Sequence, residues 1–158
     1  MRRFVFTLEH MRDYKVQVLD AEKNTLMKLY KRLLEIEENI RLCKLFNREK
    51  REEMFCKQQQ GATMRELEEC KFYLENTRRQ LIALEEERLV AIDDVERQRK
   101  VVIKANQEVS SLDKLEERQL DDYHYLEARD KEKTMTEIVI NQMIYSKAGP
   151  QKTSGIVS

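Results

Sequence analysis

Apolar residues recur at intervals of three and four along the first part of the chain. This spacing is the a/d pattern of a coiled coil, in which one narrow apolar seam packs against a second helix. The clearest run consists of Leu26, Leu29, Leu33, Ile36, Ile40 and Cys43, and Met54 continues it beyond Asn47 and Lys50. The pattern predicts a long helix with one seam.

A second run of seam residues keeps a strict seven-residue repeat. It consists of Leu67, Cys70, Leu74, Thr77, Leu81, Leu84, Arg88, Ala91, Val95, Gln98, Val102, Ala105, Val109 and Leu112. Arg88 and Gln98 are polar, so we expect weaker packing around them or a role in fixing the register. The repeat predicts a second long helix.

One break separates the two patterns. The only proline is Pro150 and the glycines are Gly61, Gly149 and Gly155. Gly61 suits the positive φ that often ends a helix, and Thr63 can cap the next one. We therefore expect a helix over 1–57, a turn over 58–63, a helix over 64–145 and a disordered tail over 146–158.

The two seams match if the chain folds back at this turn. Opposed residues then have numbers that add up to about 121, and the matched pairs are Met54–Leu67, Ile40–Leu81, Ile36–Leu84, Leu26–Val95, Val18–Val102, Met11–Val109 and Leu8–Leu112. The prediction is an all-α fold, a long two-helix antiparallel coiled-coil hairpin with an overhanging C-terminal helix. A parallel dimer is the alternative.

The second helix is expected to extend past the first and to be unpaired from about residue 118. It still carries Leu120, Tyr123, Leu126, Met135, Ile138 and Met143. Because exposed apolar stripes commonly mark protein contacts, we expect this end to dock into another protein together with Phe4 and Phe6. The alternatives are a frayed extension of the hairpin, or a bend near Ser110 and Ser111 that packs it.

Composition and charge narrow the function classes. Charged residues make up 38% of the chain, and Lys plus Arg equals Asp plus Glu at 30 each, which leaves no basic excess for binding nucleic acid. No apolar stretch approaches the roughly 20 residues of a spanning helix, and no signal peptide is recognisable. We expect a cytoplasmic protein whose three cysteines, Cys43, Cys56 and Cys70, are reduced thiols.

Catalytic chemistry is not expected. A two-stranded coiled coil offers no concave pocket, and His10 and His124 are isolated. Acidic runs such as Glu85-Glu86-Glu87 point in different directions on a helix, so we interpret them as solvated. The sequence predicts no enzyme activity, no catalytic or metal-binding residues, no cofactor and no small-molecule substrate.

Segments at both ends of the chain carry motifs, and heptad repetition alone does not explain the N-terminal one. The opening Phe4-Val5-Phe6-Thr7-Leu8, followed by Met11-Arg12-Asp13-Tyr14-Lys15, is similar to F-x-F-x-L-x-x-V-L-x-Y-[KR], the start of the flagellar export protein FliJ family. Residues 115–123 are similar to its L-x-E-[KR]-x-x-x-x-Y segment, and residues 136–139 to its D-E-[IL]-[AV] close. The departures are Met11 and Arg12 in place of Val-Leu, and Thr136 in place of Asp.

The resemblance implies an accessory component of flagellar type III protein export, and so a role in flagellum assembly and motility. Such a protein contacts the export ATPase ring and the cytoplasmic domain of the export gate, escorts substrate chaperones, and lies at the inner face of the cell membrane. The implied partner-binding residues are Phe4, Phe6, Leu8, Tyr14, Tyr123 and Leu126, and the apolar overhang adds Ile138. The competing interpretation is a structural coiled-coil tether or cytoskeletal linker.

Overall fold

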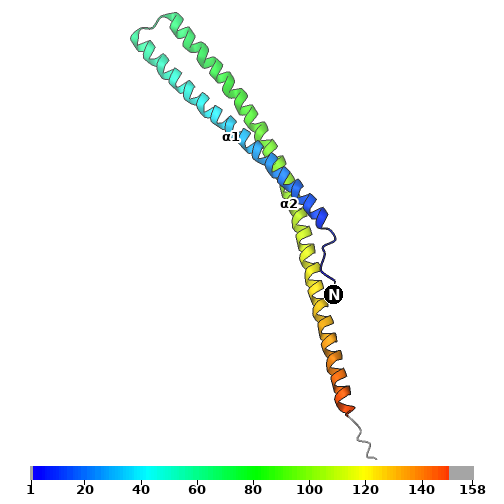
Figure 1. Ribbon diagram of the computed structural model, residues 1–158. Coiled ribbons are helices and arrows are strands. Elements are labelled where there is room, and N and C mark those ends of the chain that lie inside the picture. Colours follow the sequence, from blue (N-terminus) through cyan, green and yellow to red (C-terminus); the bar gives the residue numbers. More distant parts are fainter. Residues whose placement is uncertain (1, 150–158) are drawn as a thin grey trace, which may run out of the picture. The chain divides into compact units, whose positions relative to one another are not determined.

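The computed structural model describes residues 2–149, which form two long helices packed against each other and no strand. Helix α1 spans Glu9–Gln60 and helix α2 spans Met64–Lys147 (Figure 1). The expected all-helical class is therefore confirmed. The described chain divides into two compact units, one made of residues 13–109 and the other of residues 2–12 and 110–149.

The helix ends differ from the expected ones. Residues 2–8 are not helical, so the helix expected over 1–57 begins only at Glu9 and continues to Gln60. Ser146 and Lys147 belong to α2 instead of the expected tail. Residues 150–158 of that tail lie outside the described residues. Helix α2 continues through Ser110 and Ser111 without interruption.

The connection between the helices follows the predicted turn chemistry. Gly61 has a φ of +82°, and the Ala62 amide donates to the Lys57 carbonyl at 2.9 Å, the bond that closes a Schellman helix end. The Thr63 hydroxyl accepts a hydrogen bond from the Glu66 amide at 3.4 Å and so caps α2. Both predicted capping roles are confirmed.

The seam is where the sequence placed it from Leu26 onward. Every predicted seam residue from Leu26 to Met54 on α1 and from Leu67 to Leu112 on α2 is buried or half-buried. Ile36, Ile40 and Ala91 form one cluster, against which Leu33, Leu81 and Leu84 pack. Leu19, Ala105 and Val109 form another, with Val16 and Val102 beside them. Interhelical packing of these side chains stabilises the helices far more than their own propensity does.

Near its start, α1 presents different residues to the seam than expected. Met11 was expected opposite Val109, but 48% of its surface is exposed, and Arg12 and Lys15 are half-buried in its place. The strict heptad continues through these charged positions because long basic side chains lay their methylenes on apolar surface and keep their charge in water. Leu19, not Val18, then becomes the buried position.

Polar contacts cross the seam in the unit formed by residues 13–109. Lys15 Nζ lies 2.9 Å from Glu108 Oε2, and this hydrogen bond lowers the pKa of the Glu108 carboxyl. Gln98 donates to the Glu22 carbonyl at 3.1 Å, and Cys43 donates to the Thr77 carbonyl at 3.6 Å. The polar seam residue Gln98 is thus satisfied by α1.

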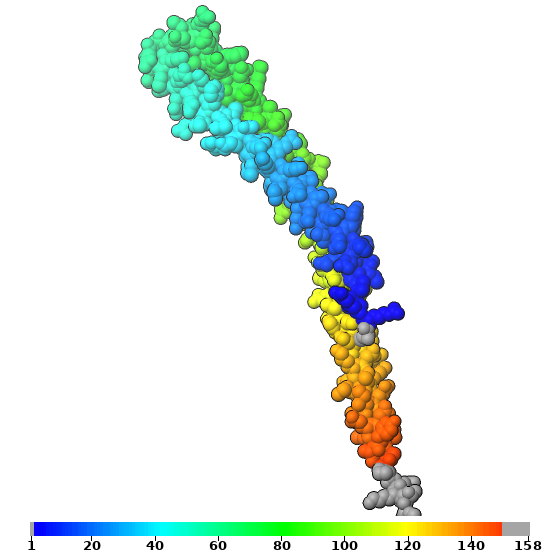
Figure 2. All heavy atoms as spheres, viewed as in Figure 1, coloured from blue at the N-terminus to red at the C-terminus, as the bar shows by residue number. Residues whose placement is uncertain are grey.

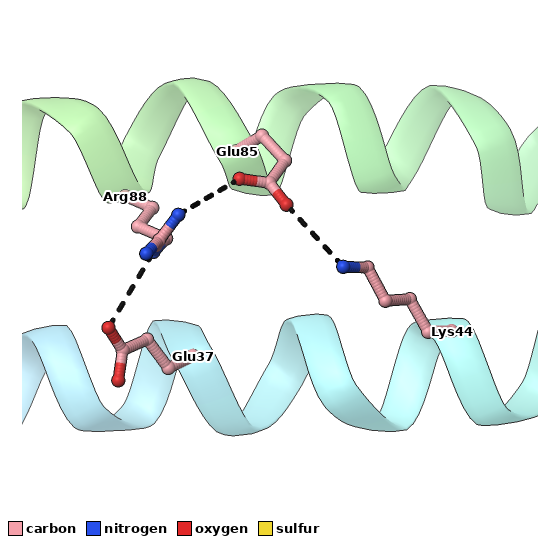
Figure 3. Close-up of polar contacts among 4 residues, drawn as sticks. All are labelled: Glu37, Lys44, Glu85 and Arg88. Carbon is pink, nitrogen blue, oxygen red and sulfur yellow. Dashed lines mark hydrogen bonds and ion pairs between the residues drawn. The ribbon is translucent and has the colours of Figure 1, made fainter.

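Arg88, the charged residue of the second seam, lies between two carboxylates. Its guanidinium is 3.6 Å from Glu37 on α1 and 3.5 Å from Glu85 on α2, and Glu85 also lies 3.9 Å from Lys44 (Figure 3). These side chains remain roughly 40% exposed or more, so their ion pairs contribute little to stability.

Candidate partner-binding surface

The predicted surface falls mainly in the unit made of residues 2–12 and 110–149. Phe4, Phe6, Leu8, Tyr123, Leu126 and Ile138 belong to this unit. Tyr14 belongs to the other unit, on the first turns of α1, and is 62% exposed. The six residues of the first unit do not form one continuous exposed patch, because the N-terminal residues pack against α2.

Residues 2–8 lie against α2 as a non-helical segment. The Phe4 ring is 5.6 Å from the Tyr123 ring, and the Tyr123 hydroxyl donates to the Arg2 carbonyl at 2.9 Å. A non-helical chain can advance up to about 3.3 Å per residue, against 1.5 Å in a helix. The segment therefore reaches Tyr123, whereas a helical start would have placed Phe4 near Glu117.

Phe6 anchors this segment. It is only 5% exposed, and its carbonyl accepts a hydrogen bond from the Glu9 amide at 3.3 Å where α1 begins. Arg12 lies 2.6 Å from Asp113 and 3.3 Å from Glu116 on α2, which adds charge pairing to the same contact. Phe6 was expected to face a partner, but in this arrangement its side chain is inaccessible, and half-buried Leu8 is largely so.

Beyond Tyr123, the side chains of α2 are mostly exposed to solvent. Leu126 is 44% exposed, and each described residue from Ala128 to Gly149 is exposed. Figure 2 shows no part of residues 2–12 against the orange and red portion of α2 on the visible face. The covered stretch of α2 in this unit thus extends to Tyr123, beyond the expected limit at about residue 118.

The last helical turns carry an apolar collar, which we define as residues 134–146. Its only charged residue is Glu137. Its exposed apolar side chains, with the exposed fraction of each, are Met135 (64%), Ile138 (47%), Val139 (45%), Ile140 (50%), Met143 (59%), Ile144 (59%) and Tyr145 (81%). Successive residues turn by about 100° on a helix, so three apolar residues in a row cover most of its circumference.

The hydroxyls of the collar are directed at its own backbone. Thr134 and Thr136 donate to the carbonyls of Asp130 and Glu132 at 2.9 and 2.8 Å, and Ser146 donates to the Met143 carbonyl at 2.9 Å. These internal bonds reduce what the collar can offer to water or to a polar partner. Ile138 and two other collar residues were expected from the sequence to be exposed, but the apolar coverage of most of the helix circumference was not expected. The single charge in residues 134–146 is the signal that could have shown it.

Polar groups near the collar form local pairs. His124 Nδ1 lies 3.8 Å from Glu127, and Lys131 lies 3.3 Å from the same carboxylate. Within residues 2–149 no group of three His, Cys, Asp or Glu side chains is arranged to hold a metal ion. Over the same residues, neither helix contains a stretch apolar enough to cross a membrane.

Comparisons of the chain with protein-family models, with curated proteins and with solved structures found no match.

Proposed function

We propose that this chain is an accessory component of the flagellar type III export apparatus and that it acts by binding, not by catalysis. Its partners are the export ATPase ring and the cytoplasmic domain of the export gate, with substrate chaperones as a third class. The FliJ-like start of the chain and its similar segments at 115–123 and 136–139 support this assignment. The proposed location is the cytoplasm, at the inner face of the cell membrane.

The proposed working form is an antiparallel coiled-coil hairpin with an overhanging C-terminal helix. The cross-helix contacts support it, because Lys15 meets Glu108, Glu22 meets Gln98 and Cys43 meets Thr77. Residue numbers rise on α1 as they fall on α2, which is the order of two oppositely directed helices. The exposed stretch after Tyr123 then forms the overhang.

The observation that carries the proposal is the collar at residues 134–146. A helix end whose apolar residues cover most of its circumference is usually buried over most of its surface, since each exposed apolar side chain costs free energy in water. A flat groove would cover only one face of it. The collar therefore fits a socket that encloses the helix end, and the central opening of an ATPase ring is a partner of that geometry.

The seven predicted binding residues divide into two roles. Leu126 and Ile138 are exposed on α2 and contact the partner directly, as does Tyr14 on α1. Phe4, Phe6, Leu8 and Tyr123 hold residues 2–8 against α2 and so set where the exposed stretch begins.

Binding to purified export ATPase tests the proposal. The variant Ile138→Glu with Met143→Glu places two charges in the collar, and we expect it to weaken binding by about tenfold or more because buried unpaired charges are costly. Glu132→Ala with Lys133→Ala, which changes exposed polar residues beside the collar, serves as the control and should bind normally. Circular dichroism should show equal helicity for all variants.

Unchanged binding by the Ile138→Glu, Met143→Glu variant would reject the collar as the contact. If the wild-type chain binds neither the ATPase nor the gate domain, that result supports the alternative function, which is a structural tether or cytoskeletal linker. A tether needs attachment surfaces at separate places, and the exposed side chains of Phe55, Met64 and Phe72 around the turn provide a second apolar region.

A further inference from the structure

A second apolar surface lies in the unit formed by residues 13–109, on one flank of the two helices. Seam residues are lettered a and d, with Leu26 and Leu33 at a on α1 and Arg88 and Val95 at a on α2. Positions b and e then lie on the same side of each helix. Lys44 and Glu85, both at e, approach to 3.9 Å, so the e positions of the two helices share one flank.

This b/e flank is apolar midway along the paired helices. Met27, Leu34 and Leu89 occupy b positions and are 69%, 64% and 64% exposed, while Tyr30 at e is 43% exposed and Ile92 at e is half-buried. At the same level the opposite flank is mostly charged. Its c and g positions hold one exposed apolar residue, Val90, and are otherwise Lys28, Arg32, Glu35, Glu87, Asp94 and Arg97. A cluster of several exposed apolar side chains on one flank is typical of a surface that another helix covers.

Charged residues border the patch in an ordered way. On one side the e positions hold two bases, Lys23 on α1 and Arg99 on α2. On the other side the e positions hold two acids, Glu37 on α1 and Glu85 on α2. Lys23 and Glu37 are equally far from Tyr30 along α1, and Arg99 and Glu85 are equally far from Ile92 along α2. Both acids have contacts with Arg88 inside the chain, at 3.6 and 3.5 Å, but their side chains remain 43% and 41% exposed and can accept from a second donor.

We propose that this flank is a self-association surface, on which a second copy of the chain docks with its helices reversed. A two-fold axis through Tyr30 and Ile92 makes α1 face α1 of the partner and α2 face α2 of the partner. Lys23 then faces Glu37, and Met27 faces Leu34.

The same axis also pairs the outer positions. Asp20 faces Arg41 on the α1 side, while Glu85 faces Arg99 and Ile82 faces Ile103 on the α2 side. Glu96 opposite Leu89 is the one mismatch. The other two-fold arrangement, in which α1 faces α2 of the partner, sets Lys23 against Arg99 and Glu37 against Glu85. Like charges in contact oppose that arrangement, so the charges select the reversed one.

Charge reversal in the full chain tests the proposal by sedimentation velocity at micromolar concentrations and low salt. The wild type should dimerise. Lys23→Glu should weaken the dimer by about tenfold or more, because each dimer contains the contact twice and both become repulsive. Adding Glu37→Lys should restore it. Lys28→Glu, on the charged flank, is the matched control and should leave it intact. All variants should keep the wild-type helicity.

Cross-linking identifies the interface directly. Lys23 and Glu37 are separated by 14 residues on one helix, roughly 21 Å, so a zero-length carbodiimide cannot join them within a chain. In a mixture of ordinary and nitrogen-15-labelled chains, the proposal predicts Lys23–Glu37 cross-links that contain both isotopes. A wild type that stays monomeric overturns the proposal, and so does a dimer that lacks this cross-link and tolerates Lys23→Glu. Neither result bears on binding of the export ATPase through the collar.

Discussion

Phe6 is the only aromatic side chain that is buried in residues 2–149, and it belongs to a short non-helical segment with few other contacts. Removing a buried Phe side chain costs roughly 3 to 5 kcal/mol in a compact core. The contacts of Phe4 and Arg2 with Tyr123 are partly exposed and cannot offset a loss of that size. The packing of residues 2–8 therefore depends on Phe6.

We predict that Phe6→Ala releases residues 2–8 from α2. Amide hydrogen exchange should show about tenfold or greater loss of protection at Glu9, whose amide donates to the Phe6 carbonyl, with little change in the melting of the paired helices. Val5→Ala is the matched control, because Val5 is 68% exposed. Protection that survives Phe6→Ala would show that the segment is held by other contacts.

The roles of individual residues were predicted correctly where they depend only on the residue type and its neighbours in sequence. Positive φ at Gly61 and the Thr63 cap follow from the residue types themselves. The prediction failed for Met11 and Phe6, whose surroundings depend on a partner helix. Hydrophobicity suggested Met11 for the seam, but the heptad register placed Arg12 and Lys15 there, where Asp113, Glu116 and Glu108 supply opposite charges.

Within the element, Arg88 is the weakest point of the α2 seam. An a position normally holds an aliphatic side chain, and the ion pairs that Arg88 makes with Glu37 and Glu85 are long and partly exposed. Burying a leucine in its place stabilises by roughly 1.5 kcal/mol or more, while the lost pairs are worth about 1 kcal/mol or less. The balance favours the apolar residue.

We therefore predict that Arg88→Leu raises the thermal midpoint of the helices, measured by circular dichroism at fixed chain concentration. Arg97→Leu, at an exposed position of the same helix where Arg97 pairs with Asp93, should give no such increase. A lower midpoint for Arg88→Leu would mean that the charge network across the seam stabilises the helices more than its exposure implies.

Element boundaries were predicted less well than element identity. Seven-residue periodicity over α2 locates every seam position, because one slip would move the whole stripe away from its partner. The start of α1 has no comparable signal. Periodic residues continue into residues 4–8, and only packing against α2 decides that this segment is not helical. The pattern also counts apolar residues on one face, so it did not register the collar.

At the scale of the whole molecule, the proposed direction of the helices rests on pairs such as Lys15 with Glu108 and Lys44 with Glu85. A parallel dimer would present the same heptads, since the repeat has no direction of its own. The distinguishing property is whether these pairs lie within one chain.

We predict that Lys15–Glu108 and Lys44–Glu85 are contacts within a single chain. Ordinary and nitrogen-15-labelled chains are unfolded together, refolded as a mixture and treated with a zero-length carbodiimide, which joins an ammonium to a carboxylate in contact. Lys15 Nζ and Glu108 Oε2 lie 2.9 Å apart, so a Lys15–Glu108 cross-link should form in high yield, with a single isotope in each linked peptide pair. Pairs of mixed isotopes at this position would show that α1 and α2 of different chains pack together. That result would contradict both the fold-back of the chain and the overhang that follows from it. Mixed pairs found only between Lys23 and Glu37 would contradict neither, and would show that two folded chains dock through their apolar flanks.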